Sequence, residues 1–414
     1  MRRAAAMLAV AAMLCLAACG HSGASKQASA GTSPGRTGVA ACRKATGPRV
    51  KILTMLDESQ AANVYLPNLR AGINAGVHRI NCEGGLGDVG SPVQVDFCVT
   101  SMNPNQVQAC AGSAINNKSY VAAVGDEVQE SDPGSEFAAA GLPDIPADAL
   151  TLSELTGATT FNTNAAVIHA AGEATLACHL RYKKTNQLFL DVPDTAVVIR
   201  LENQALRSYG CAPIAKTVKV PLTATDLSAE VYAASAGADA VILNLSPHDV
   251  VQAFAARQQL GIQTPFMAEG AVMSADTLKA VGDKANGMLV ADWYPPGNVS
   301  SAGNREFLAD MSAVGQSGEA DDMARAGWVA TDLLATAAHG LRTVSRASVL
   351  KALRSMTSFD AAGMTPPLDF TKPAPDPQYP RVFNLTISPS IVAGGQFKAV
   401  SGLPTFIPIF KGIG

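Results

Sequence analysis

The sequence predicts an α/β protein made of two doubly wound parallel-sheet domains. Its 414 residues are more than one hydrophobic core supports, so a division into two domains is expected. Short apolar runs alternate with segments of helical periodicity over most of the chain, which predicts parallel sheets with helical crossovers. The runs at residues 188–190 and 240–243 are apolar without alternation, as expected of strands that helices cover on both faces.

Composition and motifs narrow the class of function. The chain is 48% apolar and 16% charged, which is typical of a globular protein, and a formal net charge of −3 gives no indication of nucleic-acid binding. The sequence contains no H-E-x-x-H, G-x-S-x-G or P-loop spacing, and its histidines are scattered. We therefore expect no enzyme, no cofactor and no metal site. An envelope hydrolase or another enzyme on a similar sheet stays an alternative.

Residues 1–18 are predicted to be a lipoprotein signal peptide. Arg2 and Arg3 give a positive start, and the apolar stretch that follows is too short to span a bilayer after cleavage. The sequence Leu16-Ala17-Ala18-Cys19 resembles a bacterial lipobox, which implies that Cys19 becomes the acylated first residue. The alternative is an ordinary signal peptide followed by a chance cysteine.

Residues 19–45 are predicted to be a flexible tether. The stretch is rich in Gly, Ser, Ala and Thr and has almost nothing to bury. No later run of about 20 apolar residues follows, so the lipid is expected to be the only membrane anchor. The protein should therefore be exported and held at the outer face of the bacterial cell membrane.

The folded part is predicted to begin with a strand–helix–strand–helix–strand unit. Strands are expected at residues 50–56, 93–99 and 120–125, with an amphipathic helix over 66–80 and a second helix beginning at Asn103-Pro104. Similar helix starts are expected at Asp132-Pro133 and at Ser246-Pro247. Helix N-termini beside strand ends offer unpaired N–H groups to a ligand, although simple capping explains the same residues.

This first unit resembles the type I periplasmic binding proteins. The residues that carry the resemblance are Arg70-Ala71-Gly72-Ile73, the stretch Arg79-Ile80-Asn81-Cys82-Glu83-Gly84-Gly85-Leu86-Gly87, and Val93-Gln94-Val95. The branch that it resembles most is the branched-chain amino acid (Leu/Ile/Val) binding proteins of ABC importers, over roughly residues 50–395. The resemblance implies a clamshell of two lobes joined by three hinge crossings. Such a protein closes on a small molecule and delivers it to an ABC importer permease; a ligand sensor without transport is the alternative, and a monomer is expected.

The remaining elements follow the same alternation. A short strand at 142–147 precedes a first crossing near 159–164, and the other crossings are expected at 287–296 and 366–380. The resulting lobes are residues 46–160 plus 297–357 and residues 161–296 plus 358–414. Expected strands are 187–192, 213–220, 238–245 and 264–270, with a terminal hairpin of 382–387 and 396–400. Expected helices are 194–209, 225–236, 247–260, 304–313, 322–339 and 345–356.

Eight cysteines are present, and six of them are expected to form disulfides. Cys15 leaves with the signal peptide and Cys19 takes the lipid, which leaves an even number in an oxidising compartment. We favour pairing between neighbours in the chain, although other pairings stay open. A metal site is less favoured because no C-x-x-C spacing occurs. The favoured pairs are Cys42–Cys82, Cys98–Cys110 and Cys178–Cys211.

Glu269 is the first candidate for ligand contact. The sequence Phe266-Met267-Ala268-Glu269-Gly270 resembles the family's F-M-G-P-E-G, which implies that Glu269 pairs with the ammonium group of a ligand. Ser246 stands where the same relatives place a tyrosine, which implies a roomier or different site. The alternatives are an exposed loop acid for Glu269 and a helix cap for Ser246.

Three further candidates follow predicted strands. Glu127 and Asp148 lie in loops where the relatives carry small residues that hold the ligand's carboxylate, and two acids there would repel a carboxylate. We therefore expect a ligand with an amine or several hydroxyls rather than a net anion, unless both acids are solvated loop residues. Trp293, at the second crossing, is expected to stack on a ligand or to pack in the hinge.

Overall fold

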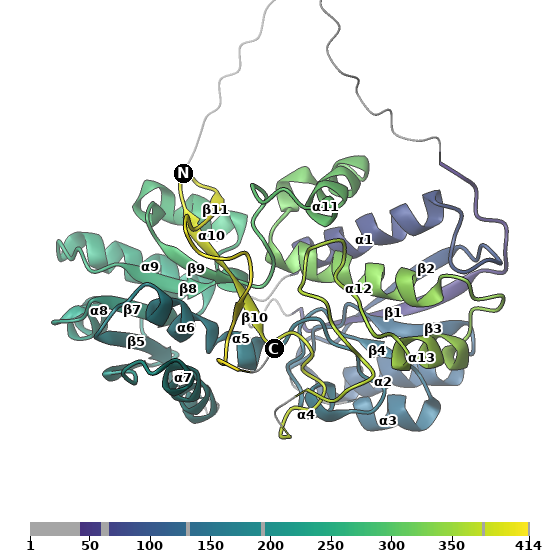
Figure 1. The fold of residues 1–414 in the computed structure, drawn as a ribbon, viewed down its shortest axis with the longest axis horizontal. Coiled ribbons are helices and arrows are strands. Elements are labelled where there is room, and N and C mark those ends of the chain that lie inside the picture. Colours follow the sequence, from purple (N-terminus) through teal and green to yellow (C-terminus); the bar gives the residue numbers. More distant parts are fainter. Residues whose placement is uncertain (1–41, 59–65, 130–132, 192–194, 375–376, 413–414) are drawn as a thin grey trace, which may run out of the picture. The chain divides into compact units, whose positions relative to one another are not determined.

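The computed structural model describes residues 42–58, 66–129, 133–191, 195–374 and 377–412 (Figure 1). The predicted signal peptide, Cys19, most of the tether and Asp132 lie outside the described residues. Within the described ranges, no helix is long and apolar enough to cross a membrane.

The first lobe contains a parallel sheet in the order β2-β1-β3-β4. The central strand β1 pairs with β2 from Val50↔Val93 onward and with β3 on its other side. The predicted strand at 142–147 is reduced to two paired residues, because Pro143 and Pro146 flank it and neither has an N–H to donate. The strands are β1 Val50–Leu56, β2 Val93–Val99, β3 Tyr120–Val124 and β4 Asp144–Ile145.

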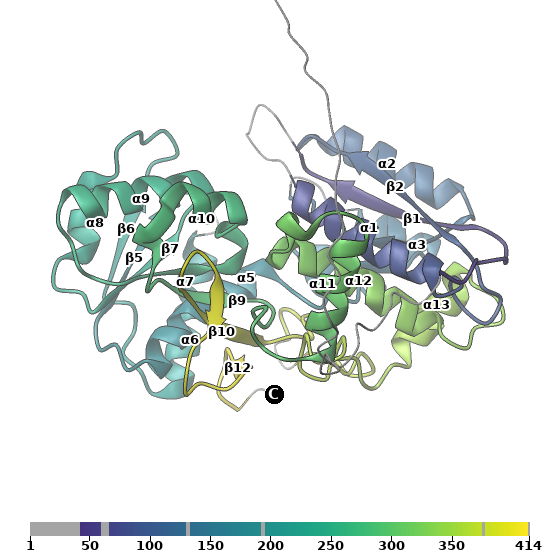
Figure 2. The same cartoon turned by 90° about the horizontal axis from the view of Figure 1, so that it is seen from above.

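Helices from two distant parts of the chain cover this sheet. α1 and α12 lie side by side (Figures 1 and 2), and a Cβ on Gly72 would stand 1.9 Å from the carbonyl oxygen of Ala324. The glycine is therefore required for this close helix pairing. α2 and α3 belong to a second apolar cluster that contains Leu53 and Ala123, so both sheet faces are covered. The helices are α1 Pro67–Cys82, α2 Pro104–Asn116, α3 Gly134–Ala140, α4 Leu152–Thr156, α11 Ala302–Ala313, α12 Asp322–Ala338 and α13 Arg346–Arg354, with the 3₁₀ helix η3 Ser317–Glu319.

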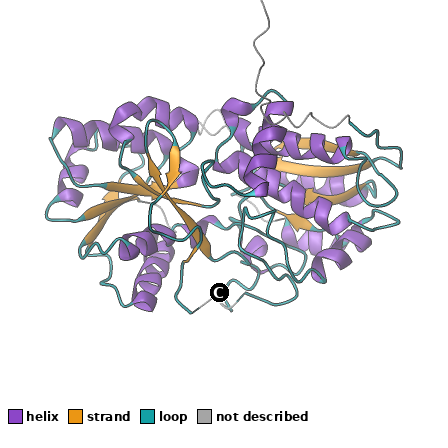
Figure 3. Cartoon of the chain, turned by 45° about the horizontal axis from the view of Figure 1, so that its top comes forward, coloured by secondary structure: helices purple, strands orange, loops and turns teal. Residues whose placement is uncertain are grey.

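The second lobe contains a larger sheet in the order β11-β10-β9-β8-β7-β5-β6, flanked by helices (Figure 3). The strands from β5 to β9 pair in parallel, and β10 is antiparallel to β9. Its strands are β5 Thr185–Leu190, β6 Lys216–Val220, β7 Ala240–Asn244, β8 Phe266–Glu269, β9 Leu289–Asp292, β10 Thr386–Val392, β11 Phe397–Ala399 and β12 Ile407–Pro408. Its helices are α5 Ala166–His169, α6 Gly172–His179, α7 Thr195–Tyr209, α8 Ser228–Ser235, α9 Pro247–Gln259, α10 Ala275–Val281, η1 Gly270–Val272 and η2 Gly282–Ala285.

The first strand of the terminal hairpin is displaced along the chain from its predicted position, whereas β11 lies within the range 396–400 expected for the second. The first strand was expected at residues 382–387, but β10 begins at Thr386 and pairs with β11 from Ser390↔Ala399. The side chain of Asn384 accepts hydrogen bonds from the N–H and the hydroxyl of Thr386, at 3.1 and 2.8 Å. This local turn ends the preceding segment and sets the start of the strand.

The segment after α13 packs with the first lobe. Phe359, Leu368 and Phe370 belong to the same apolar core as α1 and α12, whereas the lobe limits expected from the sequence assigned residues from 358 onward to the second lobe. The strands β10 to β12 that follow lie in the second sheet. The lobe limits themselves stay a prediction.

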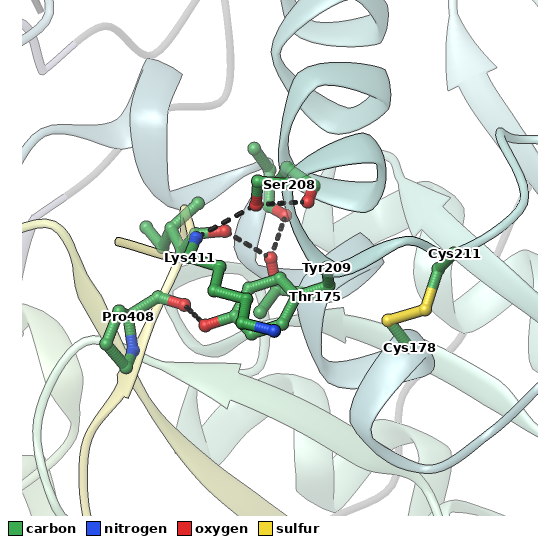
Figure 4. The surroundings of a disulfide bond; sticks show 10 residues. Thr175, Cys178, Ser208, Tyr209, Cys211, Pro408 and Lys411 are labelled. Carbon is green, nitrogen blue, oxygen red and sulfur yellow. Dashed lines mark hydrogen bonds between the residues drawn. A yellow bond between two sulfur atoms is a disulfide. The ribbon is translucent and has the colours of Figure 1, made fainter. Parts of the chain in front are cut away.

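Three disulfides are present with the predicted pairing. Cys42–Cys82 joins the segment before β1 to the end of α1, and Cys98–Cys110 joins β2 to α2. Cys178–Cys211 joins the end of α6 to the segment after α7 (Figure 4).

The C-terminal segment lies against α6 and α7, next to the disulfide that links the end of α6 to the segment after α7 (Figure 4). Thr175 on α6 donates a hydrogen bond to the carbonyl oxygen of Ile409 at 2.8 Å, and Tyr209 on α7 donates one to Pro408 at 2.5 Å. The N–H of Lys411 donates to the hydroxyl of Ser208 at 2.9 Å. The disulfide and these bonds therefore hold three separate chain segments together.

Candidate ligand-binding site

The predicted acidic side chains gather at the carboxyl ends of the strands. Glu127 follows β3, Asp148 follows β4 and Glu269 ends β8, the edge where ligands bind in open α/β sheets. Burial is the main cause that raises the pKa of Asp148 well above its usual range, and the charges of Glu269 and Glu127 raise it further. The structure thus brings acids from both lobes within electrostatic reach of one another.

Glu269 is partly exposed, and one of its carboxyl oxygens is held in place. Its Oε1 accepts a hydrogen bond from the indole Nε1 of Trp293 at 2.5 Å. Burial raises the pKa of Glu269 to about 7, the bond from Trp293 acts in the opposite direction, and the charge of Asp322 raises the pKa again. At neutral pH the group is therefore poised between its neutral and charged forms, so a cation beside it would favour the charged form.

Glu269 lines a pocket of about 220 Å³ at the ends of β5, β7 and β8. Its polar lining side chains are Glu173, Asn244, Ser246 and Glu269. No Lys, Arg or His is among the lining residues, whereas two of them are acids. The apolar part of the wall consists of Phe189, Leu190, Leu243, Leu245 and Val272.

Ser246 lies in the wall of this pocket and caps α9. Its hydroxyl accepts a hydrogen bond from the N–H of Asp249 at 3.2 Å and donates one to the Oδ2 of Asp249 at 2.6 Å. The expected capping role is confirmed, as it is for Asn103 on α2. Because the hydroxyl is engaged in the cap, the short side chain of Ser246 mainly leaves space.

Glu127 and Asp148 are buried, so the alternative of solvated loop acids does not hold. They are 6% and 5% exposed. Asp148 Oδ1 accepts a hydrogen bond from the N–H of Ala166 at 2.7 Å, across the first crossing. Glu127 Oε1 accepts one from Gln129 at 3.1 Å, whereas its Oε2 has no partner within the described ranges. Burial, with smaller effects from Asp57 and Glu58, raises the pKa of Glu127 to about 7.

Trp293 is packed inside the protein rather than presented to solvent. It is 1% exposed and belongs to the core of the first lobe. Besides the bond to Glu269, its backbone N–H donates to Asp322 Oδ2 at 3.0 Å. The position favours the hinge-packing role, in which Trp293 orients Glu269, over stacking on a ligand.

Two buried carboxyl groups, those of Asp292 and Asp322, lie close to Gly270, the residue that follows β8. A Cβ on Gly270 would stand 2.3 Å from Asp322 Oδ2 and 2.5 Å from Asp292 Oδ1. Burial raises the pKa of Asp292 well above its usual range, with a further rise from Asp322, while Arg325 lowers it. Arg325 Nη1 lies 3.5 Å from Asp322 Oδ1. Gly270 is therefore the residue that lets β8 approach these two acids.

Sequence reasoning missed two buried acids near this pocket. Glu173 lies in the first turn of α6, a helix with no periodic apolar pattern because most of its residues are buried. Glu202 lies on α7 and accepts a hydrogen bond from Asn244 at 3.0 Å. The burial of Glu202 was predictable from the sequence, because Glu202 lies on the same apolar face of α7 as Val198 and Leu206, four residues before and after it.

A larger cavity of about 770 Å³ lies away from these strand ends. It is bounded by α10, α11, the start of α12 and the β10–β11 hairpin, and its lining includes Lys279, Arg325 and Lys398. None of the five predicted ligand residues lines it. Its size alone does not outweigh the acids that converge at the smaller pocket.

The sequence profile described as "Periplasmic binding protein" matches residues 49–381. The chain belongs to this family. Its two α/β parallel-sheet domains have the type I fold of that family. Members of the family are binding proteins rather than enzymes, and they act outside the cytoplasm. No curated protein matches the chain.

Solved structures agree with the fold but differ in their ligands. A possible leucine/isoleucine/valine-binding protein from Rhodopirellula baltica is 16% identical, with a TM-score of 0.69 over 86% of this chain and 97% of that one. A solute-binding protein of an ABC transporter from R. palustris, in complex with 4-hydroxybenzoate, is 18% identical, with a TM-score of 0.68 over 87% and 97%. A fatty acid ABC transporter substrate-binding protein from Thermomonospora curvata is 14% identical, with a TM-score of 0.68 over 90% and 95%.

Proposed function

We propose that the protein captures a small polar ligand with an amine or several hydroxyls by closure of the two lobes, and delivers it to an ABC importer permease. The observation that carries this proposal is the set of three acids Glu127, Asp148 and Glu269 at the strand ends. Glu127 and Asp148 belong to the first lobe and Glu269 to the second. The charges of Glu127 and Glu269 both raise the pKa of Asp148. A net anion would find no basic residue in the lining of the pocket and would be repelled by each of these acids that is ionised.

Closure of the lobes follows from the connections between them. The chain passes between the sheets after β4, after β9 and before β10. Domains joined in this way rotate about their connecting segments and enclose the ligand. We place Glu269 as the main acceptor for the ligand, Ser246 as the residue that leaves it space, and Glu127 and Asp148 as the opposing groups from the first lobe. Trp293 supports Glu269.

The proposed location is the outer face of the bacterial cell membrane, through a lipid on Cys19. The lipobox-like Leu16–Cys19 and the tether to residue 45 support this anchor. A tethered monomer would keep the ligand close to the permease.

A ligand screen followed by calorimetry tests the proposed function. Thermal unfolding is measured with amino acids, amides, polyamines and sugars, since a ligand at a hundred times its Kd adds about 2.7 kcal/mol of stability. Calorimetry with the hit then compares the wild type with Glu269→Gln, for which the loss of a buried charged hydrogen bond costs about 2–5 kcal/mol. Glu306→Gln is the matched control, because Glu306 is exposed on α11.

Two results would contradict this proposal. Equal affinity of Glu269→Gln and the wild type would remove Glu269 from the site. Tight binding of a dicarboxylate would overturn the argument from charge. Chemical turnover of a hit would instead favour the enzyme alternative.

A further inference from the structure

Glu173 is a buried carboxyl group that faces the pocket without a hydrogen-bond partner. Its side chain is 0% exposed, it lines the 220 Å³ pocket, and neither of its carboxyl oxygens has a partner in the described part of the chain. The backbone N–H groups of Glu269 and Glu173 lower the pKa of the Glu173 carboxyl group. Neither N–H has the distance and angle of a hydrogen bond to that carboxyl group. A buried polar group without a partner is costly for the folded protein, so a donor that enters this pocket would relieve that cost.

The surroundings of Glu173 add negative charge and no positive charge. Burial raises the pKa of Glu173 well above its usual range, and Glu269 and Glu202 raise it further. Glu202 is fully buried; one of its carboxyl oxygens accepts a hydrogen bond from Asn244, and the other has no partner among the described residues. The lining of the pocket contains no basic residue. A cationic group would therefore find several acceptors here and no competing cation.

A metal ion does not fit this arrangement. Nowhere in the described ranges do three His, Cys, Asp or Glu side chains converge as metal ligands would. Glu173 and Glu269 of the second lobe line the pocket, whereas Glu127 and Asp148 follow strands of the first lobe. The acids of the two lobes are linked electrostatically, because Asp148 responds to the charges of both Glu269 and Glu127.

The first lobe repeats the feature that marks Glu173. Glu127 is 6% exposed, and its Oε2 is buried with no partner in the part of the chain that the structure describes. Each lobe thus presents at least one buried carboxyl oxygen that has no partner in the described part of the chain. Glu269 influences the pKa of both Glu173 and Asp148. A single ammonium group would satisfy the acceptor of one lobe and leave that of the other unpaired.

We propose that the ligand is an organic dication, such as a linear diamine, with one cationic group held by Glu173 and Glu269 and the other by Glu127 and Asp148. This inference rests on the proposed function, since it assigns a ligand class to the same cleft. Primary ammonium groups carry three donors each and match acceptors at both ends. Glu173 is then a ligand-contacting residue that no resemblance had identified.

A matched series of compounds tests the number of positive charges. Short linear diamines of graded chain length are compared by calorimetry with the monoamine and the diol of the same carbon skeleton. The best diamine is expected to bind at least about tenfold more tightly than its monoamine, because the second ion pair is lost in the latter. Binding measured in two buffers of different ionisation enthalpy is expected to show protons released by the diamine and none by the diol.

Variants at the two ends locate the two groups. Glu173→Gln is expected to weaken diamine binding by at least about tenfold. Glu127→Gln is expected to reduce the preference for the diamine over the monoamine, since it removes an acceptor for the second group only. Glu306→Gln is expected to change neither affinity. The compound series needs only the wild-type protein, so the test stands even if a variant folds poorly.

Three results would overturn the inference. Equal affinity for diamine and monoamine would mean that the protein recognises only one cationic group of the ligand, at Glu269. Tighter binding of the diol without proton release would mean that protonated acids hold a polyol. Failure of every diamine to bind would reject an organic dication as the ligand. The screen of amino acids, amides, polyamines and sugars would then test the proposed function separately.

Discussion

The indole N–H of Trp293 donates a hydrogen bond to Glu269 Oε1 over 2.5 Å. Trp293 directly follows β9 and Glu269 ends β8, so the bond ties the candidate ligand acceptor to the segment through which the chain leaves the second lobe. The backbone N–H of Trp293 is in turn held by Asp322 at the start of α12. The position of the acceptor is therefore coupled to the connection between the lobes.

Removal of this bond should change the proton affinity of Glu269. Trp293→Phe keeps an aromatic ring but deletes the donor, and the bond lowers the pKa of Glu269, so the variant's pKa should rise above about 7. A cationic ligand should then need a higher pH to reach its full affinity. Calorimetric titrations across pH would show the shift; superimposable pH profiles for variant and wild type would count against this role of Trp293.

Stability of the ligand-free protein should fall as the pH rises. Burial raises the pKa of Glu269 and Glu127 to about 7 and that of Glu202 to about 8, whereas in the unfolded chain these groups titrate near their usual value. Between these limits the unfolded chain binds fewer protons, so the free energy of unfolding decreases with pH, by at most about 1.4 kcal/mol per pH unit and group. Urea unfolding at about pH 5 and about pH 8 measures this.

A variant separates this effect from other titrating groups. Glu202→Gln cannot ionise, so the loss of stability between the two pH values should be smaller than in the wild type. Glu306→Gln should leave the slope unchanged, because Glu306 is exposed. A stability that is constant or rises over this interval would mean that the buried acids are not protonated in the folded state.

Gly270→Ala should destabilise the protein. The new Cβ would lie 2.3 Å from Asp322 Oδ2 and 2.5 Å from Asp292 Oδ1, and relief of such overpacking typically costs about 1–3 kcal/mol. Gly112→Ala on α2 is the control, because no atom lies within 4 Å of its new Cβ and alanine favours helices by about 1 kcal/mol. Thermal unfolding that ranks the two variants in the opposite order would contradict the close packing at Gly270.

The Cys178–Cys211 bridge should contribute to the stability of the second lobe. Replacing both cysteines with serine is expected to lower the free energy of unfolding by about 2–4 kcal/mol, since the closed loop no longer restricts the unfolded chain. In the wild type, a thiol reagent should find no free thiol among the six paired cysteines after denaturation without reduction. Reactive thiols in that titration would disprove the pairing.

Cys19→Ala should release the protein from the membrane fraction. The lipid on Cys19 is the only anchor expected, and the described residues contain no helix that crosses a membrane. Fractionation of cells that express wild type or variant measures the distribution. Retention of Cys19→Ala with the membranes would show that another part of the chain binds there.

The strands were predictable where they are buried between helices. β1 has the limits expected from its largely apolar run, because a parallel strand covered on both faces needs such sequence. The edge strand β2, which is mostly half-buried and contains Gln94 and Asp96, also has the expected limits. The start of β10 was not predictable from such a run, since the side chain of Asn384 decides it through a local turn. α6 was missed because a helix buried nearly all round has no apolar stripe.

The candidate site was predictable only in part for a similar reason. Glu127, Asp148 and Glu269 follow strands, and the topology of a parallel sheet brings strand ends together. Glu173 comes from a helix instead, and its approach to the pocket depends on how α6 packs on the second sheet. A position set by tertiary packing leaves no mark in local sequence periodicity.

The pairing of α1 with α12 has a consequence for biogenesis. Gly72 and Ala324 meet at a distance that excludes even one methyl group, yet the whole second sheet up to β9 lies between them in the chain. A nascent polypeptide that emerges N-terminus first must keep the apolar face of α1 uncovered until α12 has appeared. The first lobe therefore cannot finish folding until most of the chain has emerged, and holdase chaperones that shield α1 during secretion would act within that interval.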